Sequence, residues 1–243
     1  YITMEMAEER IAERIDANLM NISMEDLHDL PKQMFDNRIE KIIKSTSGKL
    51  IVKEYPTASA NSSHFRGLIK ELAIKKRFKP DIIFIDYLNI CASSRFKGAT
   101  NVNSYMYIKS IAEELRGLAV ETNLPIMSAT QTTRSGFVST DVGLEDTSES
   151  FGLPATADLM FALISNEELD ELNQIAVKQL KNRYNDLTVN KRFVIGIDRT
   201  RMRLFDIKMS EQNIVDSGQS GDAEDTFTSA VFDKTDFGEG WKV

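Results

Sequence analysis

Two acidic residues stand at the ends of short apolar runs, where a carboxylate could handle a metal ion or a proton. Asp86 follows the apolar run 82–85, and a carboxylate held at the edge of a sheet can bind Mg²⁺ through water beside a nucleotide. Glu5 follows the strand-like run 1–4 and precedes a helical pattern, so it could accept a proton from an attacking water. Taken singly, Asp86 could instead cap a strand end, and Glu5 could be a solvated acid at a helix start.

Three further polar residues end later apolar runs. Gln131 follows the run 124–130, and a neutral amide there can sense a phosphate and change partner when the phosphate leaves. Lys181 and Arg183 follow the run 175–180 and alternate along the chain, so their side chains project from one face of a strand. Two such cations could reach the phosphates of a nucleotide held by a neighbouring subunit, as an arginine finger does. A polar strand end and a solvated β-hairpin are the structural alternatives.

The elements that must position these residues alternate between strand and helix. Apolar spacing predicts helices at 7–20, 31–44, 64–78 and 104–121. Strands are predicted at 1–5, 50–53, 82–86, 124–130 and 157–164, followed by an antiparallel meander at 175–180, 191–197 and 202–206. This order indicates an α/β fold with a mostly parallel sheet flanked by helices and closed by antiparallel strands. In such a sheet the ligand site lies at the carboxyl ends of the strands.

Local signals add detail to this scheme. The continuous apolar run before Asp86 predicts a strand that is buried on both faces. Ser23 with Asp26 predicts the capped start of a short helix, and Ser62 or Ser63 is expected to cap the helix 64–78. Residues 132–154 are rich in Ser, Thr, Gly and Asp and are expected to form a long loop.

Composition excludes several classes of protein. The chain has 243 residues with one cysteine and two histidines, which excludes a disulfide framework and a cysteine-based zinc site and fits a reducing, cytoplasmic compartment. No stretch nears the roughly 18 consecutive apolar residues that favour a membrane span. The net charge is −7, which argues against a simple basic coat for nucleic acid.

The acidic charge lies almost entirely in the last segment. Residues 206–243 hold nine acids and three bases, which is −6 of the total −7. We therefore expect a folded domain at 1–206 and an acidic, disordered tail at 207–243. Aromatic residues in this tail could anchor a partner protein, with a plain solubilising tail as the alternative; they are Phe227, Phe232, Phe237 and Trp241.

Five motifs occur in one order along residues 1–206. They are Thr-Met-Glu-Met at 3–6, Ile-Asp-Tyr-Leu-Asn at 85–89, Ala-Thr-Gln-Thr-Thr-Arg at 129–134, Ser-Glu-Ser-Phe-Gly at 148–152 leading to Ala-Asp-Leu-Met at 157–160, and Leu-Lys-Asn-Arg at 180–183. Their order and spacing resemble the RecA-like motor domain of the DnaB family of replicative helicases, although no single motif is specific. The resemblance implies a ring, driven by ATP or GTP with Mg²⁺, that moves along single-stranded DNA and unwinds the duplex at a replication fork.

The resemblance also implies a role for each candidate residue. Glu5 would polarise the attacking water, and Asp86 would hold Mg²⁺ through water. Gln131 would couple the γ-phosphate to the DNA-binding loops. Lys181 and Arg183 would complete the nucleotide site of the adjacent subunit.

DNA contacts are implied for Arg134 and for the stretch Ser148, Glu149, Ser150, Phe151 and Gly152. Family members commonly begin this stretch with a basic residue. Because this chain has a serine there, the DNA contact would depend more on backbone amides, with Arg134, Arg95 or Lys97 as possible sources of charge. In a ring, several copies of one modest contact are summed, which reconciles a nearly neutral domain with DNA binding.

The family also requires a phosphate loop, G-x-x-x-x-G-K-[ST], and this sequence contains none. We expect that loop upstream of Tyr1. The implied partners are single-stranded DNA, a homo-hexamer of this chain, a primase, a helicase loader and a replicative polymerase; the implied location is the cytoplasm, that of the host if a phage encodes the protein. Two other functions remain open: a RecA-type recombination ATPase, and a non-hydrolysing module that only binds partners.

Overall fold

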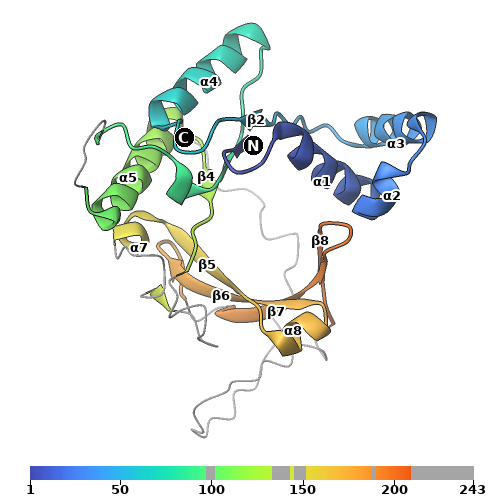
Figure 1. Cartoon of the computed structure of the whole chain (residues 1–243). Helices are drawn as coiled ribbons and strands as arrows, with labels where there is room; N and C mark the ends of the chain where they lie inside the picture. Colours follow the sequence, from blue (N-terminus) through green and yellow to red (C-terminus); the bar gives the residue numbers. More distant parts are fainter. Residues whose placement is uncertain (97–101, 133–142, 145–151, 188–189, 209–243) are drawn as a thin grey trace, which may run out of the picture.

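The computed structural model describes residues 1–96, 102–132, 143–144, 152–187 and 190–208. In this part of the chain the strands form two four-stranded sheets, one parallel and one antiparallel. The parallel sheet has the order β2-β1-β3-β4 (Figure 1). Its strands are β1 (Ile2–Thr3), β2 (Lys53–Glu54), β3 (Ile83–Asp86) and β4 (Ile126–Ser128).

One face of the parallel sheet is covered by α4 (Ser62–Lys75) and α5 (Ser104–Thr122). Ile83 and Ile85 of β3 point toward these helices and are buried with Phe65, Ile111 and Leu118. The burial of large apolar side chains on this face fixes β1 and β3 against the helices. A 3₁₀ turn, η1 (Leu88–Ile90), follows β3 directly and packs on the same core.

Within the described residues the other face of the parallel sheet is partly exposed, so β3 is not buried on both faces as predicted. Phe84 is 37% exposed and Met127 is 54% exposed. The elements α4, α5 and η1 pack on the sheet from the Ile83 side. An apolar run shows that a strand can be buried on both faces, but the tertiary neighbours decide whether it is.

Three helices extend from the β1 side of the sheet: α1 (Glu8–Met20), α2 (Met24–His28) and α3 (Lys32–Ser45). They enclose a small core of their own around Ala17, Met20 and Leu27. The predicted cap of the short helix is confirmed, because the Ser23 side chain accepts a hydrogen bond from the Asp26 amide.

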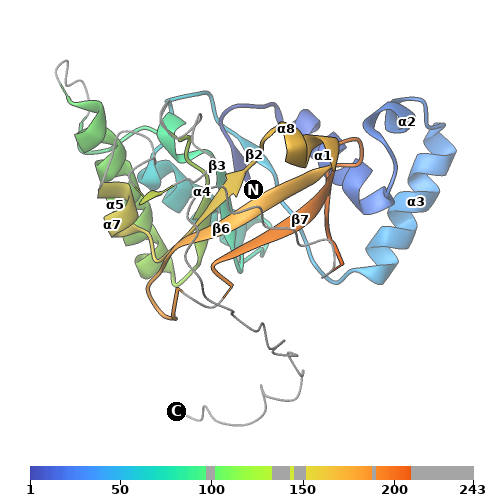
Figure 2. The same ribbon diagram turned by 90° about the horizontal axis from the view of Figure 1, so that it is seen from below.

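The antiparallel sheet has the order β5-β6-β7-β8. Its strands are β5 (Leu159–Ile164), β6 (Gln174–Asn182), β7 (Arg192–Asp198) and β8 (Arg203–Asp206), with α7 (Gly152–Thr156) before β5 and α8 (Glu167–Glu171) after it. The predicted meander is confirmed, and β5 joins it as a fourth antiparallel strand. Figure 2 shows this sheet running between α5 and α7 on one side and α1 to α3 on the other.

Contacts at both ends of the antiparallel sheet join it to the rest of the domain. At one end, the Asn18 side chain donates to the Met202 carbonyl over 2.7 Å and the Met24 amide donates to the Thr200 carbonyl over 2.9 Å. At the other end, α7 packs on α5. A Cβ added to Gly152 would lie 2.6 Å from Cδ of Lys109, so glycine permits this close approach.

Two local expectations were wrong. Asn61, rather than either serine, caps α4: its side chain accepts from the Ser63 and His64 amides, and His64 completes the capping box. The predicted loop 132–154 overlaps α7, which begins at Gly152. Most of that loop, and the predicted tail from 209 onward, lie outside the described residues. No helix in the described part of the chain is long and apolar enough to cross a membrane.

Candidate active site

The carboxyl ends of β1 and β3 bring Glu5 and Asp86 to one edge of the parallel sheet. Thr3 pairs with Asp86 in the ladder, and the Met4 amide donates to the Asp86 carbonyl over 3.0 Å. Glu5 is the next residue along and is exposed. The register of β1 on β3 therefore brings the two acids to the same edge of the sheet, although about 80 residues separate them in the chain.

A short turn holds Glu5 in place. The Thr3 hydroxyl accepts from the Met6 amide over 3.1 Å and donates to the Met6 carbonyl over 2.8 Å. The Thr57 hydroxyl donates to the Met4 carbonyl over 2.7 Å. These bonds fix the backbone on both sides of Glu5, while its carboxylate remains open to solvent and free to meet a substrate.

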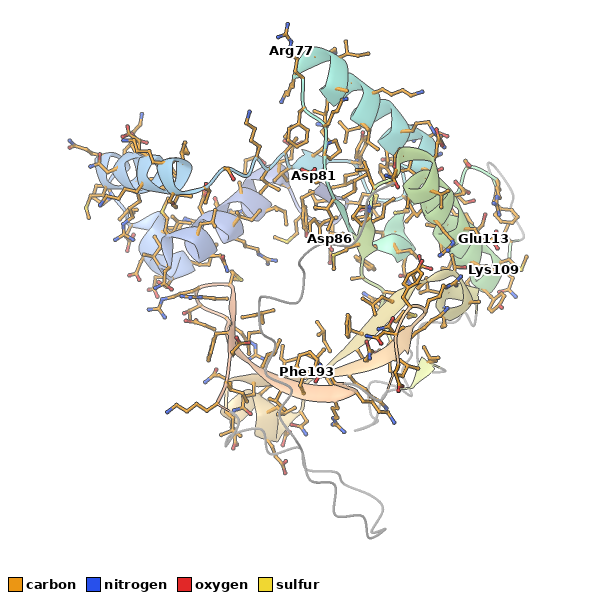
Figure 3. All side chains as sticks on the ribbon, turned by 180° about the vertical axis from the view of Figure 1, so that it is seen from behind. Arg77, Asp81, Asp86, Lys109, Glu113 and Phe193 are labelled. Atoms are coloured by element: carbon orange, nitrogen blue, oxygen red, sulfur yellow. The ribbon has the colours of Figure 1, made fainter. Side chains whose placement is uncertain are left out.

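Asp86 is half-buried and accepts a hydrogen bond at Oδ2 from the Tyr1 hydroxyl over 2.7 Å. Burial, followed by this bond, raises the pKa of the Tyr1 hydroxyl above its usual range. Tyr1 therefore stays protonated at neutral pH and orients one oxygen of the Asp86 carboxylate. Figure 3 labels Asp86 at the end of β3, away from Asp81 and Arg77, which lie toward the start of this strand.

Gln131 is joined to the Asp86 strand through Tyr87. Its Nε2 donates to the Tyr87 hydroxyl over 3.1 Å. The two strand ends are also joined by the Thr130 hydroxyl, which donates to Oδ1 of Asn89 over 2.8 Å. A change of hydrogen-bond partner at the Gln131 amide would therefore alter a contact of Tyr87, the residue next to Asp86.

The donor set at this edge fits Mg²⁺ better than a metal with several protein ligands. Within the described residues, no three His, Cys, Asp or Glu side chains come together as a metal site. Mg²⁺ usually keeps several waters and takes only one or two carboxylates together with substrate phosphates. Asp86, with one oxygen oriented by Tyr1, can supply such a single carboxylate.

Lys181 and Arg183 lie at the end of β6, in the other sheet, and they share one face as predicted. Both donate to backbone carbonyls of α7: Lys181 to Pro154, and Arg183 through NH2 to Ala155 over 3.0 Å. Burial, then the nearby Arg183, lowers the pKa of the Lys181 ammonium. Within the described residues, Lys181 and Arg183 contact these carbonyls and Asp158, and they form no hydrogen bond or ion pair with the acids at the β1–β3 edge.

Only one of the residues expected to contact DNA lies within the described part of the chain. Gly152 begins α7 and packs on Lys109 of α5. Arg134, Ser148, Glu149, Ser150 and Phe151 lie outside the described residues. Their proposed DNA contacts stay predictions.

Sequence reasoning missed four side chains that support these candidates. Tyr1 and Tyr87 contact Asp86 and Gln131, and Asp158 and Arg116 form ion pairs next to Arg183. Tyr87 could have been found as the polar neighbour of Asp86. Asp158 stands in the motif Ala-Asp-Leu-Met at 157–160, but nothing local shows that it pairs with Arg116 and Arg183, because these side chains meet only when α5, α7 and β6 pack together.

The fold and the converging polar side chains define a class. A parallel sheet that carries two acids and an amide at its carboxyl edge, followed by an antiparallel meander with two cations, is a RecA-like α/β domain. The chain belongs to the DnaB-like helicase C terminal domain family, whose model matches residues 1–212.

Individual relatives agree with this assignment. The chain is 44% identical over 231 residues to the "DnaB-like replicative helicase" of Enterobacteria phage T4, an alignment that covers 92% of this chain and 48% of that protein. It is 33% identical over 138 residues to a "Probable plasmid replicative DNA helicase" of Chlamydia trachomatis, covering 55% of this chain and 28% of that protein. The chain thus spans half or less of the length of the curated relatives that it matches.

Two solved structures share the fold. One is described as "The Structure Of A DnaB-Like Replicative Helicase And Its Interactions With Primase"; it has a TM-score of 0.68 at 17% identity and covers 85% of this chain and 50% of that one. The other is an isolated "ATPase Domain", with a TM-score of 0.69 at 16% identity, covering 85% of this chain and 74% of that one.

Proposed function

We propose that this chain is part of an ATP-driven replicative DNA helicase, which moves on single-stranded DNA as a ring and unwinds the duplex at a replication fork. The observation that carries this proposal is the convergence of Glu5, Asp86 and Gln131 at one edge of the parallel sheet. The DnaB-like family match supports the helicase over a RecA-type recombination ATPase.

At the proposed site, the chain's own residues divide the work. Glu5, exposed on its fixed turn, accepts the proton of the attacking water. Asp86, oriented by Tyr1, would hold Mg²⁺ for a bound ATP or GTP. When bound, Mg²⁺ supplies charge neutralisation for the transferred phosphoryl group. Gln131 senses the γ-phosphate and passes its loss to β3 through Tyr87.

Lys181 and Arg183 act in trans in this proposal. They lie in a different sheet from Glu5 and contact α7, so a neighbouring subunit is the natural source of the nucleotide that they meet. An arginine finger of this kind stabilises the charge of the transition state. A homo-hexamer would supply such interfaces, and residues 148–152 with Arg134 would contact the phosphates of the DNA strand.

The phosphate loop is proposed to lie on a strand upstream of Tyr1. Within the described residues, β4 pairs with β3 alone and β5 pairs with β6 alone. Both strands expose apolar side chains, Met127 at 54% and Phe161 at 49%. A further strand with its helix would bury these side chains and bring a phosphate loop to the Asp86 edge.

The test of the catalytic site is Glu5→Gln in the full-length protein. Turnover of ATP is expected to fall about 10²- to 10⁴-fold, because a general base is removed. Nucleotide binding and ring assembly are expected to remain. Glu9→Gln is the matched control, since Glu9 is an exposed acid in the first turn of α1. Near-normal steady-state ATPase in the Glu5 variant would refute the assignment.

The test of the trans role is subunit mixing. Rings formed from Arg183→Ala and Glu5→Gln subunits are expected to regain ATPase activity, because some interfaces then hold an intact Glu5 on one side and an intact Arg183 on the other. Mixed rings must be demonstrated by a size or crosslinking assay. If no mixing ratio restores activity in such rings, Arg183 does not act across the interface.

A primase, a helicase loader and a replicative polymerase are the proposed partners, with the tail as a docking segment. Its acidic charge would steer it toward a basic surface, and its aromatic residues would anchor it. Deleting residues 208–243 is expected to leave DNA-stimulated ATPase intact and to weaken partner-coupled unwinding. Equal coupling by the truncated and intact proteins at physiological salt would contradict this role.

A further inference from the structure

Asp158 lies between two arginines that come from different elements. Its Oδ1 is 2.7 Å from NH1 of Arg116 on α5 and 3.0 Å from Nε of Arg183, just past β6. The Arg183 amide also donates to the Asp158 carbonyl over 2.9 Å. Asp158 therefore contacts both the side chain and the backbone of the residue proposed to act on the neighbouring nucleotide.

The carboxyl end of α7 holds the same cations. Helix ends leave carbonyls without partners inside the helix, and here three basic side chains satisfy them. Lys181 donates to Pro154, Arg183 to Ala155 over 3.0 Å and Arg116 to Thr156 over 2.8 Å; these are three consecutive carbonyls of α7.

α7 is in turn fixed to α5 at its other end. Gly152 approaches the Lys109 side chain so closely that an added Cβ would lie 3.0 Å from Cβ of Lys109. Figure 3 labels Lys109 and Glu113 on the part of α5 beside α7. The short helix is thus held between α5 and the end of β6, so the carbonyls that bind Lys181 and Arg183 belong to a helix that also packs on α5.

Asp158 supplies the negative charge at this junction of basic side chains. Three cations, Arg116, Lys181 and Arg183, surround one carboxylate. Removing that carboxylate's charge leaves the cations to repel one another, and Arg183 loses the group that orients its Nε. A guanidinium has five N–H donors; Asp158 and Ala155 take two of them along one edge, which leaves others for a phosphate.

We propose that Asp158, held by Arg116, is the positioning residue for Arg183: it sets the orientation in which this guanidinium reaches the nucleotide of the neighbouring subunit. This inference rests on the proposed trans role of Arg183.

A purely structural role for Asp158 makes a different prediction. Asp158 and Arg183 are 39% and 40% exposed, and ion pairs this exposed contribute little to stability. Removing the pair should therefore leave the domain folded. A large effect on turnover would then come from the placement of Arg183.

The experiment is Asp158→Asn in the full-length ring. We expect DNA-stimulated turnover to fall about 10- to 100-fold, because a small displacement of a catalytic group has effects of this size, while the KM for ATP changes less than about twofold since nucleotide binding is left intact. Arg116→Gln should give the same pattern from α5, and Asp158→Glu should restore part of the loss. Asp170→Asn is the matched control, because Asp170 of α8 forms a similar exposed ion pair with Arg199, which follows β7. Unchanged turnover in both the Asp158→Asn and Arg116→Gln variants would overturn the proposal.

Subunit mixing separates this inference from the proposed function. Asp158→Asn subunits should be complemented by Glu5→Gln subunits but not by Arg183→Ala subunits, because Asp158 and Arg183 act on the same side of an interface. If Arg183→Ala itself fails to complement Glu5→Gln, the trans role is wrong. If that pair complements but Asp158→Asn also complements Arg183→Ala, only the positioning role is wrong.

Discussion

The carboxylate of Glu114 on α5 holds neighbouring segments of the domain together through hydrogen bonds. Its carboxylate accepts from the Ser93 hydroxyl over 2.6 Å, from the Ser94 amide over 3.0 Å and hydroxyl over 2.7 Å, and from the Ser62 hydroxyl over 3.0 Å. One side chain thus joins α5 to the first residue of α4 and to the segment that follows η1. We predict that Glu114→Ala frees residues 91–96 from the domain.

The size of the effect follows from the number of bonds lost. A hydrogen bond to a charged group contributes about 1.5–3 kcal/mol. Ser94 is half-buried and its hydroxyl can turn toward water in the variant, but Ser62 and Ser93 are buried, so only part of the gross loss is recovered. A residual cost of about 3 kcal/mol is equivalent to two bonds and corresponds to a rise of about 100-fold in the local opening equilibrium.

Hydrogen exchange of the full-length protein measures this opening directly. Peptides covering 91–96 should lose about 100-fold of protection in Glu114→Ala, while peptides from β6 keep theirs. Glu113→Ala is the control, since Glu113 is the adjacent residue and pairs with Arg95 and Lys109 on the surface; its loss should cost at most about 1 kcal/mol. A loss below about threefold in Glu114→Ala, or an equal loss in both variants, would refute the reasoning.

Three further outcomes are expected. Burial by itself would raise the pKa of the Glu114 carboxyl, but the hydrogen bonds from the serines together hold that pKa below its usual value of 4.5. The stability advantage of wild type over Glu114→Gln should therefore be full above pH 4.5 and shrink as the pH falls through the lower folded-state pKa. Urea unfolding at a series of pH values measures this. Gly152→Ala should shift α7 and cost about 1–3 kcal/mol of stability by overpacking against Lys109. Adding Lys109→Ala should restore much of the lost thermal stability, and no recovery in the double variant would contradict the close approach. Asn61→Ala should cost about 1 kcal/mol through loss of the α4 cap, whereas Ser63→Ala should cost less in the same unfolding assay.

Much of the fold could be predicted from periodicity alone. The predicted helix 104–121 matches α5 (Ser104–Thr122) to within one residue at its end, and the three meander strands match β6, β7 and β8. α5 carries a long apolar stripe at helical spacing, and the meander strands are apolar runs bounded by polar residues, so local pattern and tertiary packing agree. The short elements were less predictable: α8 was missed, and the strand expected at 50–53 is instead Lys53–Glu54.

Tertiary neighbours decided the features that local pattern could not. The burial of β3 on only one face depends on α4 and α5 and on what covers the Phe84 side. The cap of α4, by contrast, is local: the Asn61 side chain accepts from two amides and His64 accepts from the Asn61 amide, all within residues 61–64. The one-sided burial of β3 depends on groups that a window of adjacent residues does not contain.

The sequence by itself determined which chemical groups the protein carries and where each stands along a strand: Glu5, Asp86, Gln131, Lys181 and Arg183 each follow an apolar run, and strand ends place such residues at sheet edges. Only the tertiary structure decided which groups meet. The register of β1 on β3 brings Glu5 to Asp86, and the packing of α5, α7 and β6 brings Arg116 and Asp158 to Arg183. The physical reason is that ion pairs and hydrogen bonds act over about 3 Å, a distance that only folding sets for residues tens of positions apart.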